Sequence, residues 1–255
     1  MANKTKEIET FPFSPWTVEV HRRLFRRTIS VSLSPQRPIK VVTGKLVSQR
    51  TIYEFLLSKK EWIEKNFQRF AELAEKFPER KIRSSQTFPF LGQELPLRLS
   101  VTLLEKPFAA LQGEEIHLHF PRKIWTKDVL TQEHPGMLRV LREFYQREGI
   151  RELTARVETW AAQMRLFPKD LKFREQKTRW GSCSSSGVIH LNWRLIAFKS
   201  EIIDYVIVHE LAHLAHMNHS PLFWSLVERH CPGYQLCRRE LRELQSLCEF
   251  LSPAK

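Results

Sequence analysis

The sequence predicts an α+β fold in which a mainly β N-terminal region with one long helix precedes a largely helical region with a small sheet. Short apolar runs with a period of two, typical of strands, recur in the first half of the chain. Apolar stripes at helical spacing fill most of the second half. A polar stretch that starts at Pro121 and ends at Pro135-Gly136 separates them. We therefore expect an N-terminal α+β region over residues 1–125 and a second domain over residues 126–255.

The N-terminal region should hold several strands and one helix. Runs with the strand pattern lie at 29–33, 39–42, 87–104 and 115–120. Ser48 is a suitable N-cap for a long helix whose apolar positions continue to about residue 77, and Pro78 ends it.

The second region should consist of helices around one pair of strands. A long apolar stripe predicts a helix at 137–164. Strand patterns begin at Leu171 and span 189–195, and the turn formers at 184–187 predict a β-hairpin or two adjacent strands. Three further helices are expected at 201–217, 221–230 and 235–250.

The composition is that of a basic globular protein. Hydrophobic residues make up 42%, and 41 Lys+Arg against 28 Asp+Glu give a formal net charge of +13. This excess attracts anionic partners, although general solubility explains it equally well. Residues 1–15 lack the apolar core of a secretory signal, and no apolar run approaches the roughly 18 residues of a membrane span. We therefore expect a soluble, cytoplasmic protein without membrane contact.

Histidines concentrate in one short segment, which begins with His209-Glu210-x-x-His213. Residues four apart lie on one face of a helix, so His209 and His213 can reach one Zn²⁺ at the usual Zn–N distance of about 2.0–2.1 Å. Glu210 lies about 100° around the helix from His209. From there its carboxylate can act on a metal-bound water as a general base.

A third metal ligand is expected at His219, ten residues beyond His209. The chain must leave the helix near Met217 for His219 to swing back to the metal. Three protein ligands leave a fourth position open to water, the arrangement of catalytic zinc. The alternative is a satisfied cluster of core or helix-capping histidines. His216 is expected at the surface or behind the ligands.

Five segments carry a resemblance to a known family: KKEWIEK at 59–65, FLGQELPL at 90–97, KTRWGSCSSSGVIHLNWRLI at 177–196, DYVIVHELAHL at 204–214 and NHSPLFW at 218–224. They resemble the YgjP-like metallopeptidase-domain family, which is related to SprT-like and other zincin-type proteins. The resemblance implies a zincin-like catalytic region with an active-site helix next to a small sheet. It also implies zinc ligands and a catalytic base at His209, His213, His219 and Glu210.

Three further residues are candidates for substrate binding. Lys177 and Arg179 start the segment 177–195, which we expect to supply an edge strand for an extended peptide. Both could bind a carboxylate or a phosphate, or lie on a solvated strand face. Tyr234 could stabilise an oxyanion, with simple packing as the alternative.

The leading hypothesis is a zinc-dependent hydrolase, most simply a metallopeptidase that uses a Glu210-activated, zinc-bound water on peptide or protein substrates. The first alternative is a metal-dependent phosphohydrolase acting on nucleotides or another anionic small molecule, which the charge of +13 suits. The second is a nucleic-acid-associated metalloprotein. Its phosphate contacts could come from the basic run at 21–27 and from Arg238, Arg239 and Arg242.

Overall fold

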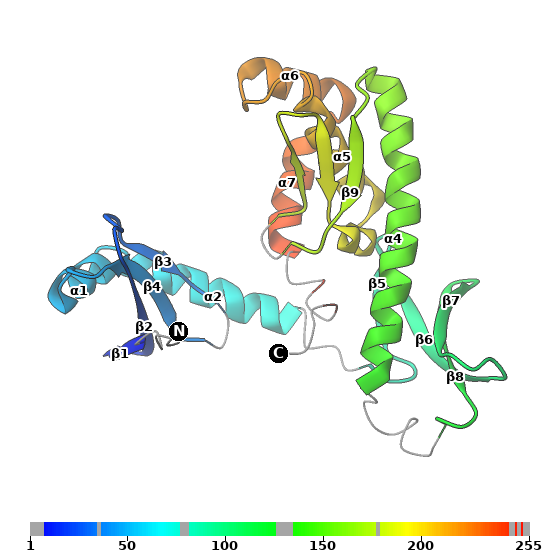
Figure 1. Ribbon diagram of the computed structural model, residues 1–255, viewed down its shortest axis with the longest axis horizontal. Helices are drawn as coiled ribbons and strands as arrows, with labels where there is room; N and C mark the ends of the chain where they lie inside the picture. Colours follow the sequence, from blue (N-terminus) through cyan, green and yellow to red (C-terminus); the bar gives the residue numbers. More distant parts are fainter. Residues whose placement is uncertain are drawn as a thin grey trace, which may run out of the picture. The chain divides into compact units, whose positions relative to one another are not determined.

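A computed structural model of the chain describes residues 8–34, 37–76, 82–125, 135–176, 179–244, 248 and 251. It contains helices and small sheets, so the predicted α+β class is confirmed (Figure 1). The packing divides the chain into two compact units, residues 1–78 and 79–255. This division lies well before the boundary at 126 that the sequence suggested. The reason is that strands between 87 and 121 contribute to the hydrophobic core of the second unit.

The first unit is a four-stranded sheet with two helices. Its strand order is β1-β2-β4-β3. The strands are β1 (Ile8–Phe13), β2 (Trp16–Arg23), β3 (Ser30–Ser32) and β4 (Ile39–Gly44). The sequence predicted β3 and β4 but not the two strands before them. In β1 the alternation is confined to the last three residues, and it includes Pro12, which is tolerated at a sheet edge.

The long helix predicted from Ser48 is two helices, α1 (Gln49–Leu57) and α2 (Lys60–Lys76). Ser48 is the N-cap as predicted, because its Oγ accepts a hydrogen bond from the Thr51 backbone N–H at 3.1 Å. Ser58 interrupts the helix, and its hydroxyl donates to the Phe55 carbonyl at 2.8 Å. Such local side-chain bonds compete with the helical pattern. The apolar spacing continues across the break, which is why the sequence suggested one helix.

The second unit begins with a four-stranded sheet of order β5-β6-β8-β7. Its strands are β5 (Thr87–Phe90), β6 (Gln93–Thr102), β7 (Phe108–Gln112) and β8 (Glu115–Pro121). The predicted run at 87–104 is thus a hairpin that turns at Leu91 and Gly92, both with positive φ. β7 was not predicted.

The helix α4 (Pro135–Met164) connects this sheet to the rest of the second unit. It contacts β7 and β8 as well as later elements of the chain (Figure 1). Tyr145 in α4 is fully buried, and its hydroxyl donates a hydrogen bond to the Pro89 carbonyl at 2.7 Å. At 1.5 Å per residue, its 30 residues span about 45 Å, which lets α4 contact β7 and β8 as well as η1 and α5.

A three-stranded sheet of order β10-β11-β9 follows α4. Its strands are β9 (Asp170–Phe173), β10 (Gly181–Cys183) and β11 (Val188–Leu191). The two predicted strands are β9 and β11, which are adjacent but parallel. The hairpin across the predicted turn at 184–187 joins β11 to β10, a strand that was not predicted. The strand expected to reach Leu195 ends at Leu191, because Asn192 caps the 3₁₀ helix η1 (Trp193–Ala197) by accepting from the Arg194 N–H.

The last three described helices are α5 (Ser200–Ala212), α6 (Pro221–His230) and α7 (Tyr234–Glu243). α5 contacts α4, α6, α7 and β10, so it lies at the centre of this region. Arg156 of α4 donates hydrogen bonds to two side chains in the first turns of α5, Asp204 at 2.8 Å and Ser200 at 2.9 Å. α5 ends before the expected residue 217, and much of 244–250 lies outside the described residues. No described helix is both long and apolar enough to cross a bilayer.

Candidate metal centre

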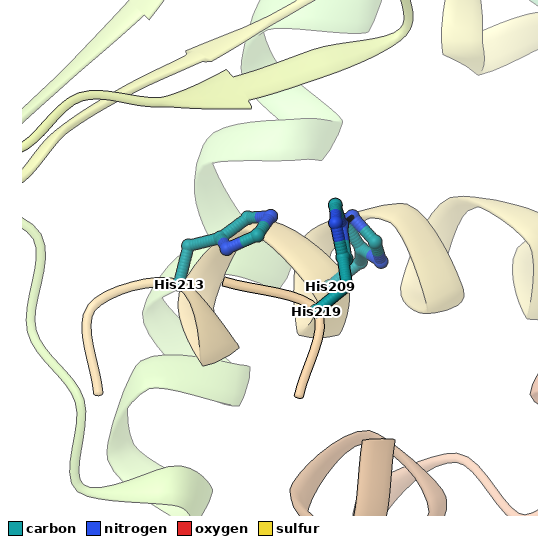
Figure 2. Close-up of side chains that lie close together, drawn as sticks. All are labelled: His209, His213 and His219. Carbon is teal, nitrogen blue, oxygen red and sulfur yellow. Dashed lines mark hydrogen bonds between the residues drawn. The ribbon is translucent and has the colours of Figure 1, made fainter. Parts of the chain in front are cut away.

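Three histidine side chains converge at the C-terminal end of α5. His209 lies in the last turn of that helix, His213 caps it, and His219 precedes α6. One ring nitrogen of each lies within 4.8 Å of the other two. The Nε2 atoms of His209 and His219 are 3.2 Å apart (Figure 2). The structure therefore brings together the three rings that the sequence singled out.

The return of His219 depends on how the chain passes from α5 to α6. Successive turns follow Ala212, and the Ser220 hydroxyl then accepts from the Phe223 N–H at 3.3 Å to cap α6. Phe223 is fully buried, and its ring centroid lies 4.6–5.0 Å from the centroids of all three imidazoles. One apolar side chain thus supports the whole cluster, and the sequence analysis did not single it out.

The ring of His213 is oriented by a backbone carbonyl. Its Nδ1 lies 3.1 Å from the His216 oxygen, and because a carbonyl only accepts, Nδ1 carries the proton. Nε2 is then the basic nitrogen. Hydrogen bonds of this kind fix the tautomer of metal-binding histidines. His216 contributes its carbonyl here, while its own ring is not part of the cluster.

The environment of His209 and His213 favours the neutral ring, the state in which imidazole binds a metal. Burial, together with the neighbouring histidines, lowers the pKa of His209 to about 3. Burial also lowers the pKa of His213. Two nitrogens on one tetrahedral zinc lie about 3.3 Å apart, close to the 3.2 Å between His209 and His219. The three side chains therefore fit a divalent cation such as zinc.

Glu210 is the acidic side chain of the site. It is 6% exposed, and burial raises its pKa to about 8 against the opposing charge of Arg179. Its Oε2 and the Nδ1 of His209 are buried without a hydrogen-bond partner among the described residues. Buried unpaired polar atoms are rare and often mark an ion or water that binds there. This fits a hydrated cation beside Glu210.

The Glu210 side chain can occupy its observed position because residue 181 is glycine. A Cβ at Gly181 would lie 2.6 Å from both Cγ and Oε1 of Glu210. Strand β10 can therefore pass directly over the carboxylate. The sequence analysis did not single out this residue, although a glycine inside a strand often marks such a close approach.

The cluster faces a pocket of about 310 Å³. Its walls are Arg179, Gly181, Ser182, Cys183, His209, Glu210, His213, Met217 and His219. Arg179 is exposed, and its backbone carbonyl accepts from the Asn192 side chain at 3.4 Å. Burial and the charge of Glu210 raise the pKa of the Cys183 thiol, which therefore stays protonated. Lys177 lies outside the described residues.

The chain is similar to a known protein family. The model of the YgjP-like, metallopeptidase domain family matches residues 27–244. The chain belongs to this family. The YgjP-like resemblance is thereby confirmed, and the protein is a metal-dependent hydrolase of the metallopeptidase class.

Two solved structures are also similar to parts of this YgjP-like chain. One is the metallopeptidase zymogen of Pyrococcus abyssi abylysin, with 26% identity and a TM-score of 0.34, covering 36% of this chain and 95% of that one. The other is the metallopeptidase zymogen of Methanocaldococcus jannaschii jannalysin, with 19% identity, a TM-score of 0.31, and coverages of 34% and 94%. No curated protein matches the chain.

Tyr234 lies outside the pocket of the YgjP-like site. It lines a neighbouring hollow, and its ring stacks on Trp224 with centroids 5.1 Å apart. Trp224 stacks in turn on His219 at 5.5 Å. The Tyr234 ring thus contacts the histidine cluster through Trp224, and the oxyanion role suggested by the sequence stays a prediction.

Proposed function

We propose that this protein is a zinc-dependent peptidase in which His209, His213 and His219 bind the metal and Glu210 is the general base. The observation that carries the proposal is the convergence of three imidazoles and one buried carboxylate on a single pocket. Three histidines suit zinc and leave a coordination position open.

The residues of the chain have distinct tasks in this reaction. Zinc, when bound, would polarise the substrate carbonyl and make water more acidic. Glu210 accepts a proton from the attacking water, and the water oxygen bonds to the carbonyl carbon. As the C–N bond breaks, Glu210 passes the proton to the leaving amine. Burial raises the pKa of Glu210, and a bound cation would lower it again, which favours the ionised carboxylate that accepts the proton.

The peptide substrate would lie along β10. Among the described strands β10 pairs with β11, and its other edge is available to an extended peptide. Arg179 lies two residues before this strand and lines the pocket, so it would bind a substrate carboxylate. We propose the same role for Lys177. The free thiols of the chain suit a reducing, cytoplasmic setting.

The Glu210→Gln variant tests the proposed base. Zinc content should stay at that of the parent protein, whereas cleavage of a casein or peptide panel should fall at least about 100-fold, as for loss of a general base. Glu228→Gln, an exposed change on α6, is the matched control and should cleave normally. Full activity of Glu210→Gln would refute the role.

A chelator arm and a nucleotide panel complete the experiment. Chelator should abolish peptide cleavage, and added zinc should restore it. Phosphate release from nucleotides, without peptide cleavage, would replace the peptidase proposal with the phosphohydrolase alternative. The family match does not favour nucleotide or nucleic acid partners, since its model describes a metallopeptidase domain.

A further inference from the structure

A second hollow, of about 350 Å³, lies beside the metal centre on α7. Its walls are Tyr234, Gln235, Arg238, Arg239 and Arg242. Three guanidinium groups thus border a space whose walls contain no carboxylate. Arg238 and Arg239 are exposed and form no ion pair with any described residue. Glu240 of the same helix is paired with Lys199 at 2.7 Å instead.

Trp224 joins this hollow to the histidine cluster. Its ring stacks on His219 with centroids 5.5 Å apart, and on Tyr234 at 5.1 Å. The guanidinium carbon of Arg238 lies 5.1 Å from the centroid of the same ring. The hollow is therefore a neighbour of the reacting centre.

We propose that this hollow, the basic subsite, binds an acidic side chain of the peptide substrate and makes the enzyme prefer Glu or Asp near the cleaved bond. The proposal rests on the peptidase function proposed above. An extended peptide advances about 3.3–3.6 Å per residue. The ring centroids of His219 and Trp224 are 5.5 Å apart, and those of Trp224 and Tyr234 are 5.1 Å apart. A peptide that crosses this distance would have its acidic residue about two to four positions from the cleaved bond.

Arginine chemistry favours a carboxylate as the ligand. The planar guanidinium donates two parallel hydrogen bonds to a carboxylate. Its contact with Trp224 holds Arg238 in place, which reduces the conformational entropy lost on binding. A nucleic acid strand needs cationic contacts along an extended track. Here the three arginines border one hollow on one helix, which suits a single acidic side chain better.

The test compares matched fluorogenic peptides that differ by Glu, Gln or Lys at one position, scanned two to four residues from the cleaved bond. For the zinc-loaded full-length protein, kcat/KM should be about fivefold higher for Glu than for Gln at one of these positions, as expected of one exposed ion pair. The double variant Arg238→Gln/Arg239→Gln should lose this discrimination. Arg238→Glu should reverse it in favour of Lys. Arg229→Gln removes an exposed arginine of α6 outside the hollow and should keep the parent preference.

Binding to zinc-loaded Glu210→Gln protein separates this proposal from the peptidase function. Labelled Glu peptide should bind more tightly than Gln peptide, and the arginine double variant should remove the difference. If no peptide is cleaved but this difference is found, the peptidase function fails and the subsite stands. Cleavage without a Glu preference overturns the subsite alone. Tighter binding of labelled single-stranded DNA than of Glu peptide, dependent on the same arginines, also overturns it.

Discussion

At the scale of single residues, burial determines the chemistry of the metal centre. His209 and Glu210 are adjacent, and burial shifts their pKa values in opposite directions, to about 3 and about 8. Both shifts favour the uncharged form of the group. A cation bound to three imidazoles would supply the positive charge that this buried site lacks, so metal binding and ionisation of Glu210 should support each other.

Replacing Gly181 with Ala should impair the base without removing the metal. The new Cβ would lie 2.6 Å from the Glu210 side chain, which cannot move freely because it is buried. We expect kcat to fall at least about tenfold, since displacement of a catalytic group by about 1 Å is costly. Zinc content, measured by metal analysis, should be unchanged. Unimpaired kcat would show that Glu210 does not need its observed position.

The metal-free protein should become less stable as the pH rises from 6.5 to 8. In this range folded Glu210 retains its proton, whereas the unfolded chain, with a carboxyl pKa near 4.5, has lost it. The folded state binds more protons, so the free energy of unfolding falls with pH. The lowered pKa of His209 has the opposite effect, because it makes the free energy of unfolding rise with pH, but only between about pH 3 and pH 6.5.

Urea unfolding in the presence of chelator, at several pH values, measures this effect. Glu210→Gln should remove the slope between pH 6.5 and 8, because an amide does not titrate. An identical slope in the variant would assign the effect to another group. Zinc should also flatten the profile of the parent protein, since a nearby cation lowers the pKa of the carboxyl.

At the scale of elements, the site depends on how closely α4 and η1 approach each other. Gly149 lies in the middle of α4, and a Cβ there would be 2.5 Å from the Trp193 carbonyl oxygen. In the sequence η1 lies between β11, which pairs with the pocket-lining strand β10, and α5, which carries His209 and Glu210. The contact between helix and 3₁₀ helix therefore needs a residue without a side chain.

Gly149→Ala should destabilise the protein despite the better helix propensity of alanine. Alanine gains about 1 kcal/mol in a helix interior, but overpacking against backbone costs about 1–3 kcal/mol. The thermal midpoint should therefore fall. Gly233→Ala is the control, because a Cβ there has no neighbour within 4 Å, and its midpoint should change little. A raised midpoint for Gly149→Ala would contradict the close approach.

At the scale of the whole molecule, two separate hydrophobic cores determine what can fold alone. The core of residues 1–78 includes Val18, Ile39 and Ile52. The core of residues 79–255 includes Phe88 from β5 and Phe144 from α4 in one cluster. A fragment that omits β5–β8 would therefore expose part of the second core.

Two fragments distinguish the possible domain boundaries. Residues 79–255 should unfold cooperatively and bind zinc, because their core is complete. Residues 126–255 lack the sheet that covers α4 and should be insoluble or lack a cooperative transition. Circular dichroism melts and metal analysis of both fragments provide the measurement. Cooperative folding of residues 126–255 would support the domain boundary near residue 126 that the sequence predicts.

The sequence by itself determined where many of the elements lie and which three histidines stand out. Period-two and helical patterns are local, and they predicted β8, α4 and α6 close to their observed bounds. The four-residue spacing of His209 and His213 follows from helix geometry alone. His219 was predicted as the third ligand because it lies ten residues beyond His209, where a chain that leaves the helix near Met217 can return to the metal. Ser220, the next residue, caps α6.

Tertiary structure alone decided what surrounds those residues. Gly181 lies directly against the Glu210 side chain, and Phe223 packs against three imidazoles. Trp224 stacks on Tyr234 and on the histidine cluster. The boundary at 78 was also set by packing, since it depends on which strands share a core. These contacts join segments up to tens of residues apart. Periodicity carries no information about them, because it encodes which face of an element is buried but not which partner buries it.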